Sequence, residues 1–137
     1  MKATVNLQQN VNFKAVSGTG HTIEMDGPPD FGGENLGARP MEVMLIGMGG
    51  CASFDVVHIL RKRRLVVDNC FAEIEAERAE TEPKVFTKIH LHFKVSGDAL
   101  TEKAVGKAVQ LSAEKYCSAS IMLGKTAQIS HSFEIIQ

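Results

Sequence analysis

This chain of 137 residues has few aromatic residues, few prolines and almost no net charge. It has no tryptophan, one tyrosine and four prolines, and its formal net charge is −1. Without a basic surplus, the chain is not expected to bind nucleic acid. Hydrophobic residues make up 44% of the sequence, which indicates a folded rather than a disordered chain. We therefore expect the partner to be a small molecule or a second copy of the same chain.

The first residues and the longest uncharged stretch are not expected to act as a signal peptide or a membrane span. Residues 1–8 alternate polar and apolar side chains without the apolar core of a signal peptide, so we expect a cytoplasmic protein. The longest uncharged stretch near the middle, residues 43–54, is far shorter than the roughly 20 residues of a membrane span. No membrane partner is expected.

Cysteines are few, at positions 51, 70 and 117. An odd number in a reducing cytoplasm argues against a permanent disulfide framework and leaves reactive or buried thiols. The length suits a single domain, residues 1–137, with one core.

The spacing of apolar residues predicts an α+β fold. Alternation over the first 25 residues predicts an antiparallel meander of three strands. The remaining patterns predict a loop over 27–39, a helix over 40–62, a hairpin of strands 70–77 and 85–95, a helix over 101–116, a short helix over 118–122 and a last strand over 127–136. Pro40 suits the first helical position, and Ser118 can cap the short helix. Four basic residues, 61–64, suit the negative end of the first helix; a nucleic-acid or localisation patch is the weaker interpretation.

The hairpin is expected to have one apolar and one charged face. The inward residues of the second strand would be Val85, Thr87, Ile89, Leu91, Phe93 and Val95. The outward residues would set Glu73, Glu75 and Glu77 against Lys88, His90, His92 and Lys94, an arrangement that cross-strand attraction stabilises. His90 and His92 could in principle hold zinc, but no third ligand is evident nearby. We interpret them as part of a solvated face.

Three glycines precede the first cysteine within the predicted helix. Gly47, Gly49 and Gly50 each cost a helix about 1 kcal/mol relative to alanine. Their presence beside Cys51 indicates that another backbone approaches closely there.

Three segments carry a family resemblance: Pro40–Glu42, Gly49–Val57 and Leu111–Ser118. Together they resemble the OsmC/Ohr family of thiol-dependent hydroperoxide reductases, and most closely its small YhfA-type branch. The resemblance covers nearly the whole chain, and its specificity lies in the combination of the motifs. It implies an OsmC-like fold, in which two chains form an intertwined homodimer with curved antiparallel sheets around two long central helices. The thiol sites would lie at the subunit interface.

The same resemblance implies the chemistry of the thiols. Cys51 would attack an organic hydroperoxide, Cys117 would resolve the sulfenic acid as a disulfide, and a dithiol would reduce that disulfide, with no cofactor or metal. An ordinary thiol is only about 3% ionised at neutral pH, so Cys51 needs a cation, and Arg39 is the only arginine upstream of it. The alternative interpretation of Cys51 is a small buried hydrophobic residue. Cys70 matches no family motif and is expected in the core.

The sequence departs from the family at the acid that orients the arginine. Most members carry a glutamate directly after the proline, but here that position is Met41 and the acid is Glu42, about 100° further round the helix. Glu42 therefore cannot simply inherit the role. The leading prediction is reduction of organic hydroperoxides. The second is a non-catalytic redox sensor or a carrier of an apolar ligand.

Overall fold

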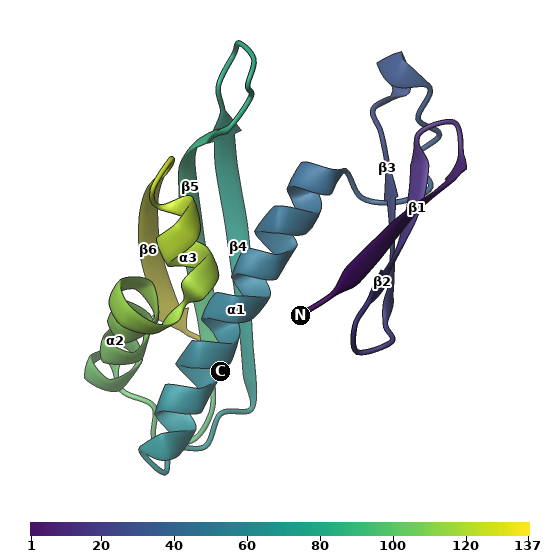
Figure 1. The fold of residues 1–137 in the computed structure, drawn as a ribbon. Helices are drawn as coiled ribbons and strands as arrows, with labels where there is room; N and C mark the ends of the chain where they lie inside the picture. Colours follow the sequence, from purple (N-terminus) through teal and green to yellow (C-terminus); the bar gives the residue numbers. More distant parts are fainter. The chain divides into compact units, whose positions relative to one another are not determined.

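A computed structural model describes all residues from 1 to 137 and confirms the α+β class. The elements are β1 (Ala3–Gln9), β2 (Asn12–Ser17), β3 (Thr22–Asp26), η1 (Pro29–Phe31), α1 (Pro40–Lys62), β4 (Asn69–Arg78), β5 (Phe86–Ser96), α2 (Glu102–Leu111), η2 (Ser112–Tyr116), α3 (Ser118–Leu123) and β6 (Gln128–Ile135). They form two compact units, residues 1–46 and 47–137, and α1 begins in the first and ends in the second (Figure 1).

The first unit is built on a three-stranded antiparallel sheet in the order β1-β2-β3, which confirms the predicted meander. All seven residues of β1 are exposed. The buried side chains of this unit, Asn12 and Asp26, are both polar. A small sheet without an apolar core is not stable by itself in water.

The loop after β3 folds around the carboxylate of Asp26. Its Oδ2 accepts hydrogen bonds from the backbone N–H groups of Glu34, at 3.0 Å, and Leu36, at 3.1 Å. The Asp26 N–H donates to the carbonyl oxygen of Ala38 at 3.0 Å. The bonds that the carboxylate accepts, first that from Leu36 and then that from Glu34, lower the pKa of Asp26. The anchored loop ends at Arg39, directly before α1.

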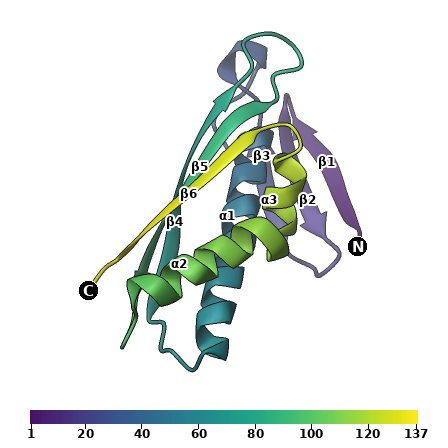
Figure 2. The same cartoon turned by 90° about the vertical axis from the view of Figure 1, so that its left-hand side faces the viewer.

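The second unit holds a sheet in the order β4-β5-β6 with helices on one face (Figures 1 and 2). Strands β4 and β5 form the predicted antiparallel hairpin, with Cys70 opposite Val95. We expected an antiparallel sheet, but strand β6 runs parallel to β5. The sheet is therefore mixed. The chain reaches β6 through α2, η2 and α3, and such a helical crossover is the usual connection between parallel strands.

The core of this unit lies between the sheet and the helices. On β5 the inward residues are Phe86, Ile89, Leu91, Phe93 and Val95. The predicted inward positions Val85 and Thr87 are exposed. Glu77 of β4 pairs with Lys88 and Arg78 pairs with Phe86, so Thr87 is an extra, unpaired residue of β5. This bulge turns Phe86 inward in place of its neighbours.

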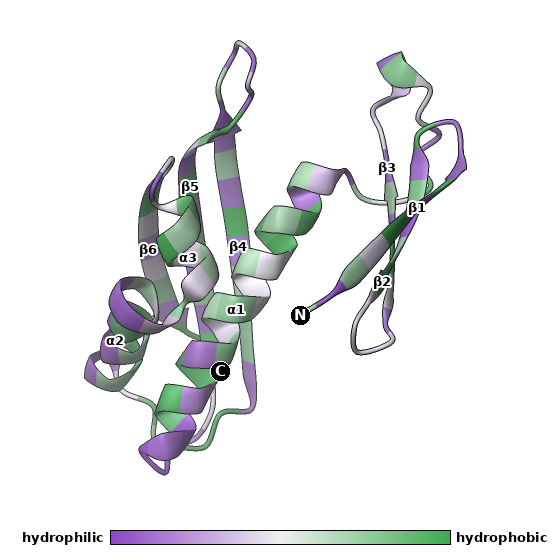
Figure 3. Ribbon diagram, in the orientation of Figure 1, coloured by the Kyte–Doolittle hydropathy of each residue, from purple (hydrophilic) through white to green (hydrophobic).

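Helix α1 is apolar over much of its length, as the green bands in Figure 3 show. Met48, Ala52, Val56 and Leu60 form one buried stripe at a spacing of four residues. Other large apolar side chains on the helix are exposed, namely Met44, Ile46 and Phe54. By length and composition alone its 23 residues could cross a bilayer, a test that core helices of other proteins also pass. The uncharged stretch of residues 43–54 is shorter than this helix, so it did not indicate that the helix is long enough to cross a bilayer.

Candidate functional site

Two cysteines and an aspartate meet where α1 passes the junction of η2 and α3. The sulfurs of Cys51 and Cys117 and a carboxylate oxygen of Asp55 all lie within 4.8 Å of one another. Cys51 and Asp55 are half-buried and stand one turn apart on α1, whereas Cys117 is fully buried. Both cysteines are free thiols. The structure thus brings together the two cysteines that the sequence singled out, and it adds Asp55.

The position of Cys117 depends on an irregular helix end. Thr101 caps the start of α2 by accepting the backbone N–H of Ala104 at 3.2 Å. After Leu111 the chain makes one π-helical turn, Ser112–Tyr116, closed by the Cys117 N–H on the Ser112 carbonyl at 2.9 Å. Such wide turns occur often at functional sites. The predicted break at Cys117 is confirmed.

Cys117 itself caps the short helix that follows. Its sulfur accepts hydrogen bonds from the backbone N–H of Ser120, at 3.4 Å, and from its hydroxyl, at 3.1 Å. The prediction that Ser118 is the cap was wrong, because Ser118 is already the first helical residue. Burial raises the pKa of Cys117, and the nearby sulfur of Cys51 raises it further, although the bonds from Ser120 act in the opposite direction. Cys117 is therefore held as a buried, protonated thiol.

Ser112 connects the π-helical turn to α1. Its hydroxyl lies 3.3 Å from the carbonyl oxygen of Ala52 and 3.3 Å from Oδ2 of Asp55. Because a hydroxyl has one hydrogen, it donates to one of these two oxygens at a time. Ser112 is 1% exposed, so this link lies inside the unit and holds the Asp55 carboxylate beside the thiols.

Arg39 and Glu42 form a second pair, in the first unit. One oxygen of Glu42 accepts the backbone N–H of Arg39 at 2.9 Å, which is one half of a capping box at the start of α1. The Arg39 guanidinium donates to the carbonyl oxygen of Gly37 at 3.2 Å. Glu42 thus contacts the backbone of Arg39 and not its side chain. This geometry agrees with the expectation that Glu42 does not take over the role of the family glutamate.

Cys70 lies apart from the thiol cluster, on the inward face of β4. Burial raises its pKa, and a hydrogen bond with Ser53 of α1 opposes the shift. On the same face, a Cβ on Gly49 would lie 2.6 Å from the Ile74 side chain. Gly49 is therefore close to a side chain, whereas a Cβ added to Gly47 or Gly50 would meet no neighbouring atom. The prediction that another backbone approaches these glycines was wrong within a single chain.

Comparison with known proteins assigns the family. A family model described as OsmC-like protein matches residues 32–132. The chain belongs to the OsmC-like protein family. Protein YhfA of Escherichia coli K12 is 44% identical over 139 residues, which is 99% of this chain and 98% of that protein.

Solved structures share the OsmC-like fold. A hypothetical protein from Aquifex aeolicus VF5 has a TM-score of 0.86 and 31% identity, covering 98% of this chain and 95% of the other. An organic hydroperoxide resistance protein OsmC from Legionella pneumophila has a TM-score of 0.73 and 16% identity, covering 98% and 97%. The second likeness shows the fold alone.

Sequence reasoning missed three residues of this OsmC-like thiol cluster: Asp55, Ser112 and Ser120. Asp55 lies four positions after Cys51, on the same side of α1, and that spacing was the available signal. The contact of Ser112 with α1 had no comparable local signal.

A pocket of about 340 Å³ lies beside the cluster. Its lining residues are Asp55, His58, Ile59, Lys62, Arg63, Leu111 and Tyr116. The exposed ring of Phe54 stacks on His58 near it, with ring centroids 5.7 Å apart. The pocket could accept a small molecule with an apolar part.

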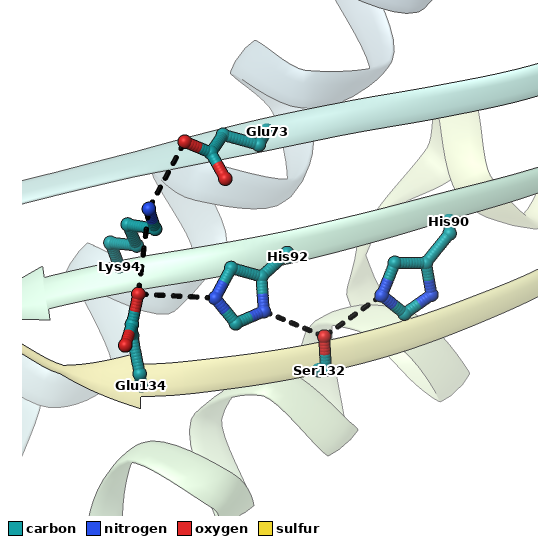
Figure 4. A network of polar contacts seen from close by, with 6 residues as sticks. All are labelled: Glu73, His90, His92, Lys94, Ser132 and Glu134. Atoms are coloured by element: carbon teal, nitrogen blue, oxygen red, sulfur yellow. Dashed lines mark hydrogen bonds and ion pairs between the residues drawn. The ribbon is translucent and has the colours of Figure 1, made fainter.

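The outer face of the second sheet carries a separate polar network (Figure 4). His90 binds the hydroxyl of Ser130 at 2.7 Å with Nδ1 and that of Ser132 at 2.8 Å with Nε2. The Ser132 hydroxyl also lies 2.7 Å from Nδ1 of His92. Every ring nitrogen of the two histidines has a protein partner, because Nε2 of His92 contacts Glu134 at 3.3 Å.

The charged end of this network confirms the predicted cross-strand pairing. Lys94 binds Glu73 of β4 at 3.1 Å and Glu134 of β6 at 3.5 Å. A hydrogen bond from His92, followed by that from Lys94, lowers the pKa of Glu134. The solvated-face interpretation of the histidines agrees with these contacts.

Proposed function

We propose that this protein reduces organic hydroperoxides in the cytoplasm with the thiol pair Cys51 and Cys117. The observation that carries the proposal is the approach of the two sulfurs to within 4.8 Å. Two thiols at that separation can close a disulfide with a small movement, since the bond itself is about 2.05 Å long. The Legionella neighbour bears the name organic hydroperoxide resistance protein, which supports the choice of substrate class.

The proposed reaction has three steps. The Cys51 thiolate attacks one oxygen of the hydroperoxide; the O–O bond breaks, the alcohol leaves with a proton, and Cys51 becomes a sulfenic acid. The Cys117 thiol then attacks that sulfur, forming the disulfide and releasing water. A dithiol finally exchanges with the disulfide, so that both cysteines return to thiols and the dithiol is oxidised.

The exposure of the two cysteines supports this division of roles. Cys51 is half-buried and reachable, whereas Cys117 is fully buried and its pKa is raised, mainly by burial. A resolving thiol can remain protonated until the sulfenic acid forms beside it. Cys117 suits that role better than the role of attacking nucleophile.

Arg39 is our candidate for the cation that activates Cys51. Its guanidinium donates to the carbonyl oxygen of Gly37, makes no salt bridge, and is near enough to Asp26 to interact with that carboxylate through space. No ion pair has to break before it binds a thiolate. Glu42 would act indirectly, by holding the Arg39 backbone at the start of α1.

A homodimer is part of the proposal. The first unit has no buried apolar side chain, β1 is exposed along its whole length, and Val5 and Leu7 are 55% and 60% exposed. Exposed apolar surface of this extent is typical of a protein interface. Gly47 and Gly50, which have free space around them, would allow a second copy to approach α1.

One observation favours the second candidate, a redox sensor or carrier of an apolar ligand. Asp55 lies within 4.8 Å of both sulfurs, so the side chain next to the thiols is a carboxylate and not a cation. Together with Met41 at the family glutamate position, this would slow a peroxidase. A sensor or carrier would react with one equivalent of oxidant at most.

Steady-state turnover of an organic hydroperoxide with a dithiol distinguishes the two functions. We expect the wild type to consume a large excess of substrate, Cys51→Ser to be inactive, and Cys117→Ser to stop or slow after one turnover. Cys70→Ser is the matched control, since Cys70 lies outside the cluster, and should keep full turnover. Consumption of only one equivalent by the wild type would reject the peroxidase.

A further inference from the structure

The thiol cluster contains three groups that can bind a metal ion, namely two thiols and one carboxylate. The donor atoms of Cys51, Cys117 and Asp55 converge to within 4.8 Å, and Asp55 makes no salt bridge. A cation bound between them would be held by the anionic forms of these groups, which are common metal ligands in proteins.

The dimensions and donor types suit a soft divalent metal. Around tetrahedral zinc, with Zn–S bonds near 2.3 Å, two sulfur ligands lie about 3.8 Å apart. The observed limit of 4.8 Å between any two donors requires only small side-chain movements. Two sulfurs and one carboxylate oxygen favour Zn²⁺ over Mg²⁺ or Ca²⁺, which prefer oxygen ligands alone.

Hydrogen bonds from outside the cluster hold two of the three donors. Ser120 donates twice to the Cys117 sulfur, which favours a thiolate there, and the Ser112 hydroxyl lies 3.3 Å from Oδ2 of Asp55. Such outer contacts are the usual support of metal ligands in proteins. Cys51 and Asp55 are only half-buried, so an ion can reach the cluster from solvent.

We propose that Cys51, Asp55 and Cys117 form a zinc site with one ion per chain and a fourth position open to water. Binding releases the thiol protons to solvent, and no electron is transferred. The site stands whether or not the protein is a peroxidase. If the proposed function holds, the ion and the Cys51–Cys117 disulfide exclude each other, so zinc would inhibit turnover reversibly and protect the thiols from oxidation.

The histidines of the outer sheet face are a weaker candidate for the same metal. All four ring nitrogens of His90 and His92 already have protein partners. A metal there would have to break those bonds, whereas at the thiol cluster no ion pair has to break. The proposal therefore predicts sulfur ligands, which a spectrum can identify.

The test is a titration of the reduced, metal-free full chain with Co²⁺ and then Zn²⁺, without oxygen or peroxide. We expect the visible bands of tetrahedral Co²⁺, a sulfur-to-cobalt charge-transfer band, a stoichiometry of one per chain, and displacement by Zn²⁺. Cys117→Ser should lose the charge-transfer intensity of one sulfur and bind at least 100-fold more weakly. Asp55→Asn should weaken binding about tenfold or more, with both sulfur contributions retained.

Cys70→Ser is the control and should titrate like the wild type, and circular dichroism of each variant checks its folding. A spectrum without sulfur-to-cobalt charge transfer, or equal affinity in Cys117→Ser and wild type, would overturn the site. Turnover is measured separately on chelator-treated protein. Failure of the zinc site and failure of the peroxidase are therefore distinct results.

Discussion

The thiol cluster and the outer-face network both gather titratable side chains from distant parts of the chain, but with opposite charge balance. On the sheet face, Lys94 lies between Glu73 and Glu134, and the histidines alternate with serine hydroxyls (Figure 4). In the cluster, two thiols meet a carboxylate that forms no salt bridge. The charges of the network are paired within the sheet, whereas the carboxylate of the cluster has no ion-pair partner. This difference supports the proposal that the chemistry takes place at the cluster.

The largest expected effect comes from removing the carboxylate of the cluster. Asp55→Asn keeps the side-chain shape but removes the negative charge beside the thiols. We expect hydroperoxide turnover to rise about tenfold, equivalent to about 1.4 kcal/mol in the barrier, while zinc affinity falls. Steady-state rates on chelator-treated protein measure the turnover, and a metal titration measures the zinc affinity. A fall in both, with the fold intact, would contradict the charge argument and indicate that Asp55 takes part in proton transfer.

A comparable effect, on stability instead of turnover, is expected from the buried hydroxyl that supports the cluster. Ser112→Ala leaves the Ala52 carbonyl or the Asp55 carboxylate without its partner, so we expect a loss of about 1–2 kcal/mol in the free energy of unfolding. Urea denaturation measures it. Ser118→Ala, at an exposed helix start, is the control and should change stability by less than about 0.5 kcal/mol. Equal effects of the two substitutions would mean that the Ser112 link is unimportant.

His131 introduces a pH dependence beneath the network. Burial, followed by the charge of His90, lowers the pKa of His131, whose Nε2 is buried without a partner. The unfolded chain therefore binds the proton first, and stability falls as the pH drops below about 6.5, by at most about 1.4 kcal/mol per pH unit. His131→Phe can keep the stacking on Phe93, where the ring centroids lie 6.2 Å apart, and should remove this slope. Urea midpoints at several pH values between 7.5 and 5 test it; an unchanged slope would assign the effect to other groups.

The smallest effect is expected in the network itself. Glu134→Gln removes the charge that Lys94 and His92 share, but these groups are partly exposed. Solvent screens pairs of this kind, so we expect a smaller loss of stability than for Ser112→Ala, and one that shrinks in high salt. Thermal unfolding in low and high salt checks both points. A larger loss, independent of salt, would show that the network has a structural role beyond charge pairing.

Local patterns in the sequence predicted most elements of the fold. Alternation predicted the meander and the hairpin, and the helical period and Pro40 predicted the start of α1. The break before Cys117 was also correct. The error at Thr87 arose because a β-bulge leaves Thr87 of β5 unpaired, with Phe86 opposite Arg78 and Lys88 opposite Glu77. A simple alternating pattern in the sequence carries no sign of such a bulge.

By itself, the sequence determined most element types and the α+β class, and through its resemblance to the OsmC/Ohr family it predicted a pair of Cys51 and Cys117. These properties depend on residues close together in the chain or on motifs that relatives share. Only the tertiary structure decided that β6 pairs parallel to β5, that Glu42 caps α1, and that Asp55 joins the thiols. The physical reason is that such contacts join residues on separate elements, whose neighbours are set by how the helices pack on the sheet.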